Sequence, residues 1–273
     1  ATALNKLGIR ARSWLGWQIP IITDNTYGKS VIENIKTDNI SKDLLVNEVA
    51  VVSGFQGVSS ENKITTLGRG GSDTTAVAMA AAFSADRCDI YTDVDGVYTT
   101  DPRIVKRAKK LDIITYEEML ELASQGAKVL QARSVALAMK YGVNLRVLSS
   151  FENLPGTSII KEGNNMEKSE ISGIAHSLNE AKITISGVPD KPGQAAEIFG
   201  SLAKFSINVD MIVQSSSINQ EATDITFTIP ETDLLTAEKT IKKIQQKIGF
   251  NKFTSDTNVV KISVVGNAMR NQS

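Results

Sequence analysis

The sequence predicts an α/β protein in which a layered domain with a mostly parallel sheet precedes a smaller ferredoxin-like unit. Up to about Ser158, short runs rich in Val, Ile and Leu alternate with helical patterns, as expected where strands and helices alternate along the chain. Beyond about Ala181 the patterns change to the order β-α-β-β-α-β, which is typical of a ferredoxin-like unit. A chain of 273 residues also has room for about two domains of ordinary size.

The first part of the chain is predicted to hold short strands over residues 31–35, 49–52, 89–94 and 145–148. The Ala-rich run 74–83 predicts a helix. Another helix is expected to begin near Tyr116, because Thr115 is followed three residues later by Glu118 in the pattern of a capping box. The opening residues 1–7 resemble the middle of a helix, so we expect the chain to be incomplete at its start.

A polar stretch separates the two parts. Residues 161–169 read KEGNNMEKS, so we expect a first domain over 1–160 and a linker over 161–170. The second unit is expected over 171–258, with helices at 195–205 and 234–248 and strands at 181–186, 208–214, 224–229 and near Phe253. A further strand over 259–265 is expected to start another unit of the same kind, truncated at residue 273.

The composition excludes several classes of partner. Thirty basic side chains balance thirty acidic ones, so no overall field attracts nucleic acid or an anionic membrane. Cys88 is the single cysteine, which excludes an internal disulfide and fits a reducing cytosol. No apolar run approaches the ~20 residues of a membrane span, and no signal peptide opens the chain. We therefore expect a cytoplasmic protein with no nucleic-acid partner, no membrane and no metal site of its own.

A glycine-rich turn leads into the Ala-rich helix, where residues 65–73 read TTLGRGGSD. Backbone N–H groups can approach an anion closely at Gly68, Gly70 and Gly71, and the helix N-terminus adds its positive end. Arg69 offers a fork of donors that fits a carboxylate or a phosphate, and a purely structural turn has no use for it. The alternative for the next two residues, Ser72 and Asp73, is that they are ordinary helix N-caps.

A second segment, YTDVDGVYTTDPR at 91–103, follows a predicted strand and so lies at the edge where open α/β sheets bind ligands. It supplies carboxylates, hydroxyls and a cation from Asp93, Asp95, Asp101, Thr99, Thr100 and Arg103. A solvated turn is the alternative, because Asp-Gly and Asp-Pro are ordinary turn dipeptides. Gly126-Ala127-Lys128 is expected to open a helix, which makes Lys128 an anion ligand if an anion lies nearby and otherwise an exposed lysine.

Together these segments resemble the aspartate kinase family of amino acid kinases. The resemblance is carried by GFQG at 54–57, TTLGRGGSDTTA at 65–76, DVDGVYTTDPR at 93–103 and EEMLELASQGAKVL at 117–130. Downstream, ITISGVPDKPGQAAEIF at 183–199 resembles the opening of that family's first ACT regulatory unit. The match runs from Ala1 to Gly266 and is specific, since other amino acid kinases lack RGGSD followed by tandem ACT sequence.

The resemblance implies transfer of the γ-phosphoryl group of ATP, with Mg²⁺, to the side-chain carboxylate of L-aspartate. The product would be 4-phospho-L-aspartate, at the first step of lysine (diaminopimelate), threonine and methionine biosynthesis. Asp73 would be the catalytic residue that orients the transfer, and the aspartate carboxylate would be held by Arg69, Gly70, Gly71 and Ser72. ATP would be bound by Thr92, Asp93, Tyr98, Thr99, Thr100, Asp101, Pro102, Arg103 and Lys128.

The same resemblance implies regulation. ACT units of this family pair and bind amino acids at their interface, so we expect a homo-oligomer that is inhibited by lysine, threonine or both. The implied effector-binding residues are Asp190, Asn208, Asp210, Gln214 and Ser217. From the residues alone, Asp190 is better explained as a turn former before Pro192, and Asn208 as a strand-entry residue.

The chain departs from the family in one respect. The family's first strand carries a lysine-glycine-glycine motif, followed by serine-rich loops and a glutamate that contacts aspartate, and these 273 residues contain none of them. We therefore expect the printed chain to lack part of the active site. The alternative function is a catalytically inactive, amino-acid-sensing regulatory subunit or fragment that pairs with a complete subunit. Another amino acid or nucleotide kinase of the same fold would not explain the ACT region.

Overall fold

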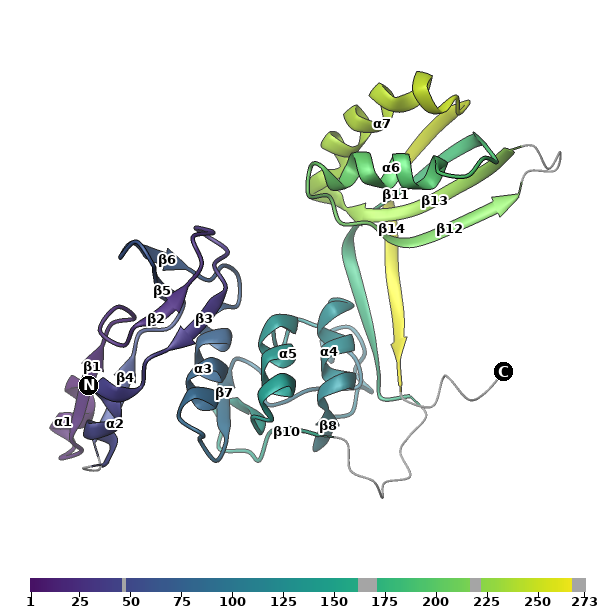
Figure 1. The fold of residues 1–273 in the computed structure, drawn as a ribbon. Helices are drawn as coiled ribbons and strands as arrows, with labels where there is room; N and C mark the ends of the chain where they lie inside the picture. Colours follow the sequence, from purple (N-terminus) through teal and green to yellow (C-terminus); the bar gives the residue numbers. More distant parts are fainter. Residues whose placement is uncertain (46–47, 162–170, 217–221, 267–273) are drawn as a thin grey trace. The chain divides into compact units, whose positions relative to one another are not determined.

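A computed structural model describes residues 1–45, 48–161, 171–216 and 222–266 of the protein. Most of the expected linker, the expected effector residue Ser217 and residues 267–273 lie outside the described residues. The chain divides into two compact units, Ala1–Ala175 with Ser263–Ser273 and His176–Ile262 (Figure 1).

The first unit combines helices and strands that alternate along the chain. Its described helices are α1 (Thr2–Lys6), α2 (Asp38–Leu45), α3 (Gly71–Ala82), α4 (Tyr116–Ser124) and α5 (Ala132–Tyr141). Its strands are β1 (Ala11–Trp14), β2 (Ile21–Thr23), β3 (Ile32–Ile35), β4 (Val49–Val52), β5 (Gln56–Ser59), β6 (Ile64–Thr66), β7 (Cys88–Thr92), β8 (Ile113–Thr115), β9 (Leu145–Ser149) and β10 (Thr157–Ile160). They form sheets of order β1-β4, β3-β2-β5-β6 and β7-β9-β10-β8.

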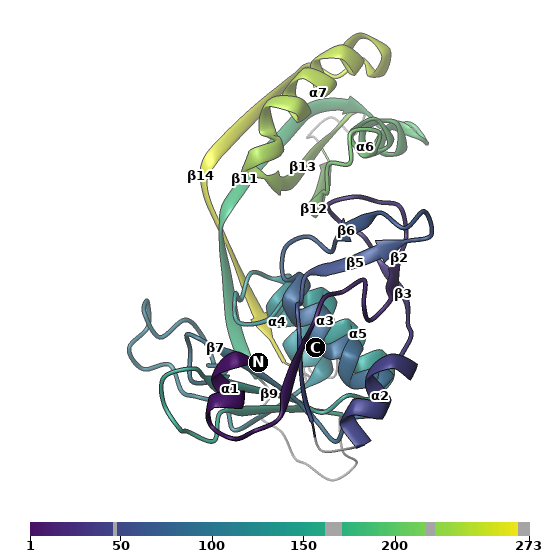
Figure 2. The same ribbon diagram turned by 90° about the vertical axis from the view of Figure 1, so that its left-hand side faces the viewer.

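Three helices pack along one face of the sheet β7-β9-β10-β8, with α5 between α3 and α4 (Figure 1 and Figure 2). β7 and β9 run parallel, which places Thr92 opposite Ser149 at their carboxyl ends. Val77 of α3, Met119 of α4 and Val135 of α5 are fully buried against this sheet. Each such side chain contributes roughly 1.5–3 kcal/mol to folding, so the apolar stripes of the helices fix their positions on the sheet.

The start of α4 has the capping box that its sequence predicted. Thr115 Oγ1 accepts a hydrogen bond from the Glu118 backbone at 3.3 Å, and Glu118 Oε2 accepts one from the Thr115 backbone at 2.9 Å. Glu118 is buried, and its other oxygen accepts a hydrogen bond from Ser172 Oγ at 2.5 Å. The prediction of this helix start is confirmed.

Two expected helix starts are wrong. The Ala-rich helix α3 begins at Gly71, before the expected residue 74, because the glycine-rich turn ends directly in the first helical turn. Lys128 does not open a helix; α5 begins at Ala132, with Gln131 as its N-cap. Lys128 therefore lies on the connection between α4 and α5.

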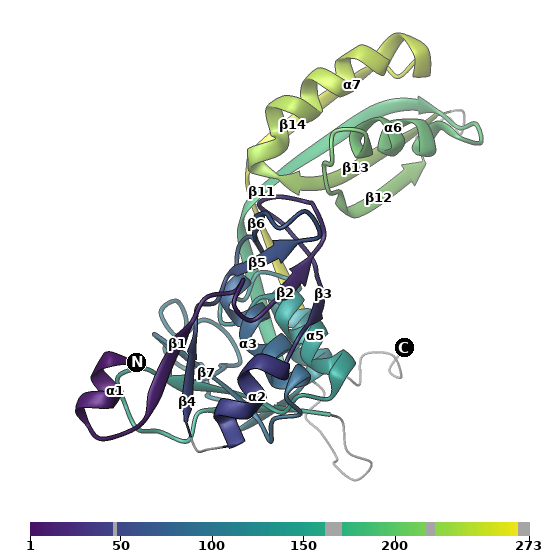
Figure 3. The same cartoon turned by 60° about the vertical axis from the view of Figure 1, so that its left-hand side comes forward.

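The second unit has the expected ferredoxin-like topology. Its elements are β11 (Gly173–Pro189), α6 (Gln194–Ala203), β12 (Asp210–Ser216), β13 (Ala222–Pro230), the short helix η1 (Glu231–Asp233), α7 (Leu234–Ile248) and β14 (Lys252–Val265), and its sheet has the order β12-β13-β11-β14 (Figure 3). The core lies between the sheet and the two α-helices, where Ile183 of β11 pairs with Phe227 of β13 and both are fully buried. Phe199 of α6 packs edge-on against Phe227, with ring centroids 5.4 Å apart.

β14 corrects the expected end of this part of the chain. The strands expected near Phe253 and over 259–265 are one continuous strand. The first residues of β11, up to Ala175, and the last residues of β14, from Ser263, group with the first unit. Among the described residues, no helix is long and apolar enough to cross a membrane.

Candidate active site

Two helix N-termini and two strand ends meet at one edge of the sheet β7-β9-β10-β8. β7 and β9 are parallel, and each follows its helix, α3 or α5, after a short connection. Each helix must therefore run back along its strand, which brings the helix N-terminus to the strand's carboxyl end. Open α/β sheets bind ligands at this edge, and the positive ends of two helices favour an anion there.

The turn between β6 and α3 carries Arg69 on a closely packed backbone. Gly68 and Gly70 have φ angles of 79° and 68°, which residues with a side chain rarely adopt. A Cβ atom on Gly68 would lie 2.9 Å from the carbonyl oxygen of Gly28, and one on Gly70 would overlap the Gln131 side chain. Arg69 itself is exposed and has no hydrogen-bond or ion-pair partner within the described ranges, so its five donors can meet a ligand.

Gly70→Ala should destabilise the protein more than Gly142→Ala does. The two glycines have φ angles of 68° and 67°, but a Cβ on Gly142 meets no atom within 4 Å. The left-handed conformation costs a residue with a side chain about 1–2 kcal/mol in both variants. In Gly70→Ala the displaced Gln131 side chain adds about 1–3 kcal/mol. Thermal denaturation measures both losses, and equal losses would contradict this view of the turn.

Asp73 is the third residue of α3, because Gly70 occupies the N-cap position in a left-handed conformation. No side chain caps this helix, so the capping explanation of Ser72 and Asp73 is wrong. Burial raises the pKa of Asp73, while interactions with the Ser72 hydroxyl and the backbone N–H of Gln131 oppose that shift. Asp73 thus connects the start of α3 with the start of α5, at a helix N-terminus that favours a negative charge.

The segment expected to bind ATP continues from β7 as a loop with its own hydrogen bonds. Thr92 Oγ1 donates to Asp93 Oδ1 at 3.1 Å, and the Tyr98 hydroxyl donates to Asp95 Oδ1 at 2.9 Å. Thr99 donates its backbone N–H to the Lys109 carbonyl at 2.9 Å. These hydrogen bonds join the loop to itself and give it a defined conformation.

The cations of this region differ in how far they are already neutralised. Arg103 donates Nε and Nη2 to Asp101 at 3.0 and 2.8 Å, and this hydrogen-bonded pair raises the pKa of Arg103. Thr100 and Pro102 lie in the same turn. Lys128 is exposed and, like Arg69, has no partner in the part of the chain that the structure describes. An incoming anion would therefore meet Arg69 and Lys128 without first breaking an ion pair.

Sequence reasoning missed Arg133, in the first turn of α5. Its Nη1 donates to the Leu67 carbonyl at 3.0 Å and its Nη2 to the Ser30 carbonyl at 2.7 Å. These acceptors are backbone atoms 66 and 103 residues away, so no local pattern identifies them. The one available signal is that a cation in the first turn of a helix opposes the helix dipole and needs compensation from elsewhere.

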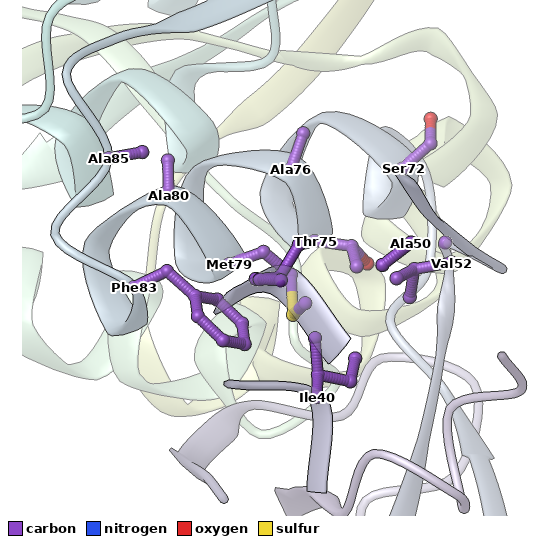
Figure 4. A pocket seen from close by; sticks show the side chains of 12 residues that line it. Ile40, Ala50, Val52, Ser72, Thr75, Ala76, Met79, Ala80, Phe83 and Ala85 are labelled. Atoms are coloured by element: carbon purple, nitrogen blue, oxygen red, sulfur yellow. The ribbon is translucent and has the colours of Figure 1, made fainter. Parts of the chain in front are cut away.

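An apolar hollow of about 470 Å³ lies between α2, β4 and α3 (Figure 4). Ile40, Val52, Met79 and Phe83 are among the residues that line it, and Ser72 and Thr75 are its hydroxyl-bearing members. None of the described residues that line it carries a charge. A phosphate or carboxylate would lose its hydration there without compensation, so the polar site is the edge that carries Arg69.

The expected effector residues do not gather in one place within the second unit. Asp190 follows the end of β11, which pairs with Ala222 of β13. Asp210 starts β12 and pairs with Thr228, six residues farther along β13 (from 222 to 228). At about 3.3 Å per residue, Ala222 and Thr228 lie roughly 20 Å apart along β13. Asp190 and Asp210 therefore do not bind one small amino acid within a single unit.

The remaining effector candidates lie near or on the edge strand β12. Lys261 Nζ donates to Asp210 Oδ2 at 2.7 Å, and this hydrogen bond lowers the pKa of Asp210. Asn208 is exposed before the strand, and Gln214 Nε2 donates to Thr223 Oγ1 at 3.3 Å. Asp210 is thus already paired with Lys261. Asp190 is exposed, and its carboxylate has no hydrogen-bond or ion-pair partner among the described residues.

The described residues contain no group of three or more His, Cys, Asp or Glu side chains that could hold a metal ion. Mg²⁺ commonly keeps several waters and is bound through one or two carboxylates together with substrate phosphates. The residues at this edge fit that mode, because Asp73 and Asp93 offer carboxylates beside the segment expected to hold the phosphates.

Known proteins match both units. The amino acid kinase family matches residues 1–149, and the ACT domain matches residues 183–245. The chain belongs to the amino acid kinase family. It is 52% identical over 274 residues to the aspartate kinase of Pseudomonas fluorescens (strain SBW25), a match that covers 100% of this chain and 66% of that protein. The aspartokinase of Corynebacterium glutamicum is 46% identical over 274 residues, covering 99% of this chain and 65% of that protein.

Solved structures agree with this family. Escherichia coli aspartokinase III in complex with aspartate and ADP matches with a TM-score of 0.79 and 27% identity, over 98% of this chain and 60% of that chain. The same enzyme with lysine and aspartate matches with a TM-score of 0.75 and 28% identity, over 97% and 59%. The predicted fold class and the predicted resemblance to aspartate kinases are confirmed. The chain spans a little less than two thirds of the relatives that it matches.

Proposed function

We propose that this amino acid kinase chain binds L-aspartate and ATP as part of an aspartate kinase, and that its ACT unit makes the activity responsive to an amino acid. The observation that carries the proposal is Arg69, a solvent-exposed guanidinium held on a rigid turn at the edge where two helix N-termini meet. Matches to aspartate kinases across nearly the whole chain support the choice of substrate.

Arg69 can bind one carboxylate of the substrate through two parallel hydrogen bonds. A guanidinium fork matches the geometry of a carboxylate, and charge-assisted bonds of this kind are stronger than neutral ones. The backbone of Gly70 and Gly71 and the hydroxyl of Ser72 lie next to it in sequence, at the positive end of α3. An amino acid bound there would have its carboxylate fixed and its side chain directed by the neighbouring groups.

The reacting group needs little activation, because the side-chain carboxylate of aspartate is already an anionic nucleophile. Its oxygen attacks the γ-phosphorus of ATP, the bond to the bridging oxygen breaks, and ADP leaves with that electron pair. Catalysis of this transfer consists of positioning and charge neutralisation. Lys128 and Arg69 supply cations that have no ion-pair partner among the described residues, and Asp73 orients the groups between the two helix starts. Mg²⁺, when bound with ATP, would neutralise part of the phosphate charge.

The product offers a direct test in the full-length protein. An acyl phosphate reacts with hydroxylamine to give a hydroxamate, so L-aspartate with ATP and Mg²⁺ should yield aspartyl hydroxamate at a rate proportional to enzyme. L-Asparagine keeps the α-carboxylate but lacks the acceptor, and should yield none. Binding of an effector amino acid without hydroxamate formation would support the alternative, a catalytically inactive sensing subunit.

Regulation is supported by the way the two long strands begin and end in the first unit. The backbone N–H of Ile174, in β11, donates to the Thr99 carbonyl at 2.7 Å, and Ser172 Oγ donates to Glu118. Ser263 Oγ, in β14, donates to Gln125 Oε1 at 2.9 Å. Both strands continue into the ACT unit, so a shift of β11 would act on the loop proposed to bind ATP, and a shift of β14 would act on the end of α4.

Lysine or threonine is expected to inhibit through the ACT unit, and Asp190→Ala should abolish that inhibition without changing turnover. An effector amino acid needs an anion for its ammonium group, and Asp190 supplies an exposed one. Inhibition requires a difference in affinity between two states, typically about 1–3 kcal/mol of coupling. Titration calorimetry with lysine, threonine and methionine measures binding, and initial rates measure inhibition.

Glu231→Ala removes another exposed acid of the same unit and should leave inhibition unchanged. Gln214→Ala should weaken effector binding, because an amide on the edge strand can pair with the effector's polar groups. If none of the three amino acids binds, or if both Asp190→Ala and Gln214→Ala retain full inhibition, the effector site is elsewhere.

A further inference from the structure

Arg133 connects three segments that are distant in sequence. It lies in the first turn of α5, half-buried, and its guanidinium donates to the carbonyls of Leu67 and Ser30. Leu67 directly precedes the turn that carries Arg69, and Ser30 belongs to the connection between β2 and β3. Leu67 is 2% exposed and Ser30 is 0% exposed, so neither carbonyl has a ready replacement partner in water.

The connection between β2 and β3 also contacts the carboxyl end of β6, just before the turn that carries Arg69. The backbone N–H of Ser30 donates to the Thr66 carbonyl at 3.0 Å, and the carbonyl oxygen of Gly28 lies 2.9 Å from the position that a Cβ on Gly68 would take. Arg133 therefore closes a ring of contacts around Leu67 and Gly68. The backbone that leads into Arg69 cannot shift without breaking one of these hydrogen bonds.

Gln131, two residues before Arg133, contacts the residues that follow Arg69. Its side chain packs against Gly70, and its backbone N–H interacts with the Asp73 carboxylate. The first turn of α5 thus contacts the glycine-rich turn on both sides of Arg69. A cation at this end of a helix opposes the dipole, so the sequence keeps an arginine where local helix chemistry disfavours one.

We propose that Arg133 is a positioning residue for substrate recognition: by fixing the Leu67 carbonyl it sets the direction of Arg69 toward the carboxylate of the substrate. The inference rests on the proposed function, since it concerns the binding of aspartate at that site. It assigns Arg133 no contact with substrate. A bidentate bond depends on the angle of the guanidinium, so a loosened turn weakens carboxylate binding more than it weakens nucleotide binding.

The test compares Arg133→Met, which keeps the apolar stem and removes the donors, with Arg133→Lys, which keeps the charge but has no planar fork. For Arg133→Met in the full-length protein we expect KM for aspartate to rise about tenfold while KM for ATP changes less than about twofold. Arg133→Lys should recover part of the loss. Arg87→Met is the matched control, because it removes a guanidinium hydrogen bond to Asp89 on another part of the same unit.

A purely structural role gives a different result. It would lower the melting temperature and the active fraction, hence kcat, with KM for aspartate unchanged, and that result overturns the inference. Amide hydrogen exchange gives a readout without catalysis, and the amides of residues 68–72 should exchange faster in Arg133→Met than in Arg87→Met. If the wild-type protein forms no hydroxamate, the proposed function fails. The positioning role of Arg133 is then tested by hydrogen exchange alone. Unchanged exchange of the amides of residues 68–72 in Arg133→Met overturns that role.

Discussion

Asp73→Asn should reduce turnover of aspartate at least about a hundredfold while the protein stays folded. Asparagine has nearly the same shape and keeps an oxygen that can accept the N–H of Gln131, so the approach of α3 and α5 is preserved. What it loses is the negative charge between the two helix starts. A small misplacement of reacting groups lowers the rate by about a hundredfold. Initial rates of hydroxamate formation measure the loss.

The stability of Asp73→Asn separates catalysis from folding. Burial raises the pKa of Asp73, so this carboxyl favours the folded state at acid pH, where it is protonated, and loses that contribution as the pH rises through its folded pKa. At neutral pH the ionised carboxylate is therefore a cost to folding. Asp73→Asn should have a melting temperature at pH 7 that equals or exceeds the wild type, with a smaller gain below about pH 4.

Asp86→Asn provides the control for Asp73→Asn, since it neutralises an exposed acid shortly after α3. It should change neither the turnover nor the melting temperature. Turnover close to that of the wild type in Asp73→Asn would remove Asp73 from the catalytic machinery. A large fall in melting temperature together with the loss of turnover would show instead that Asp73 holds α3 and α5 together.

Arg69→Ala should raise KM for aspartate at least about tenfold and leave the affinity for ATP nearly unchanged. The guanidinium is exposed and unpaired within the described residues, so its removal leaves no buried group without a partner. Each lost hydrogen bond to a charged group is worth about 1.5–3 kcal/mol, and about 1.4 kcal/mol is a factor of ten in affinity. Steady-state kinetics with each substrate varied in turn distinguish the two effects.

Arg69→Lys should recover only part of the affinity, because an ammonium group cannot bind a carboxylate through two parallel bonds. Arg107→Ala removes an exposed arginine away from the glycine-rich turn and should behave as the wild type. An unchanged KM for aspartate with weaker ATP binding in Arg69→Ala would reverse the roles of the glycine-rich turn and the loop after β7.

The element order of the ferredoxin-like unit and the main site segments could be predicted from the sequence because they depend on local chemistry, whereas many short strands of the first unit were missed. The capping box of Thr115 and Glu118, the bounds of α7 and the order of the ferredoxin-like unit follow from hydrogen bonds and apolar spacing within a few residues. Arg69 stood out for the same reason, since a cation among glycines is visible within nine residues.

Contacts between distant segments were decided by the tertiary structure alone. The N-cap of α3 is Gly70 and not Ser72 or Asp73, because the turn packs against the Gln131 side chain. Arg133 donates hydrogen bonds to two backbone carbonyls that lie 66 and 103 residues away in the sequence. Every residue has a backbone carbonyl, so no side-chain pattern identifies these two as acceptors. The sequence by itself therefore determined the order of the ferredoxin-like unit, the family resemblance and the identity of the exposed arginine. Its surroundings, and the residues that hold it in place, are set by backbone atoms that meet only when the chain has folded.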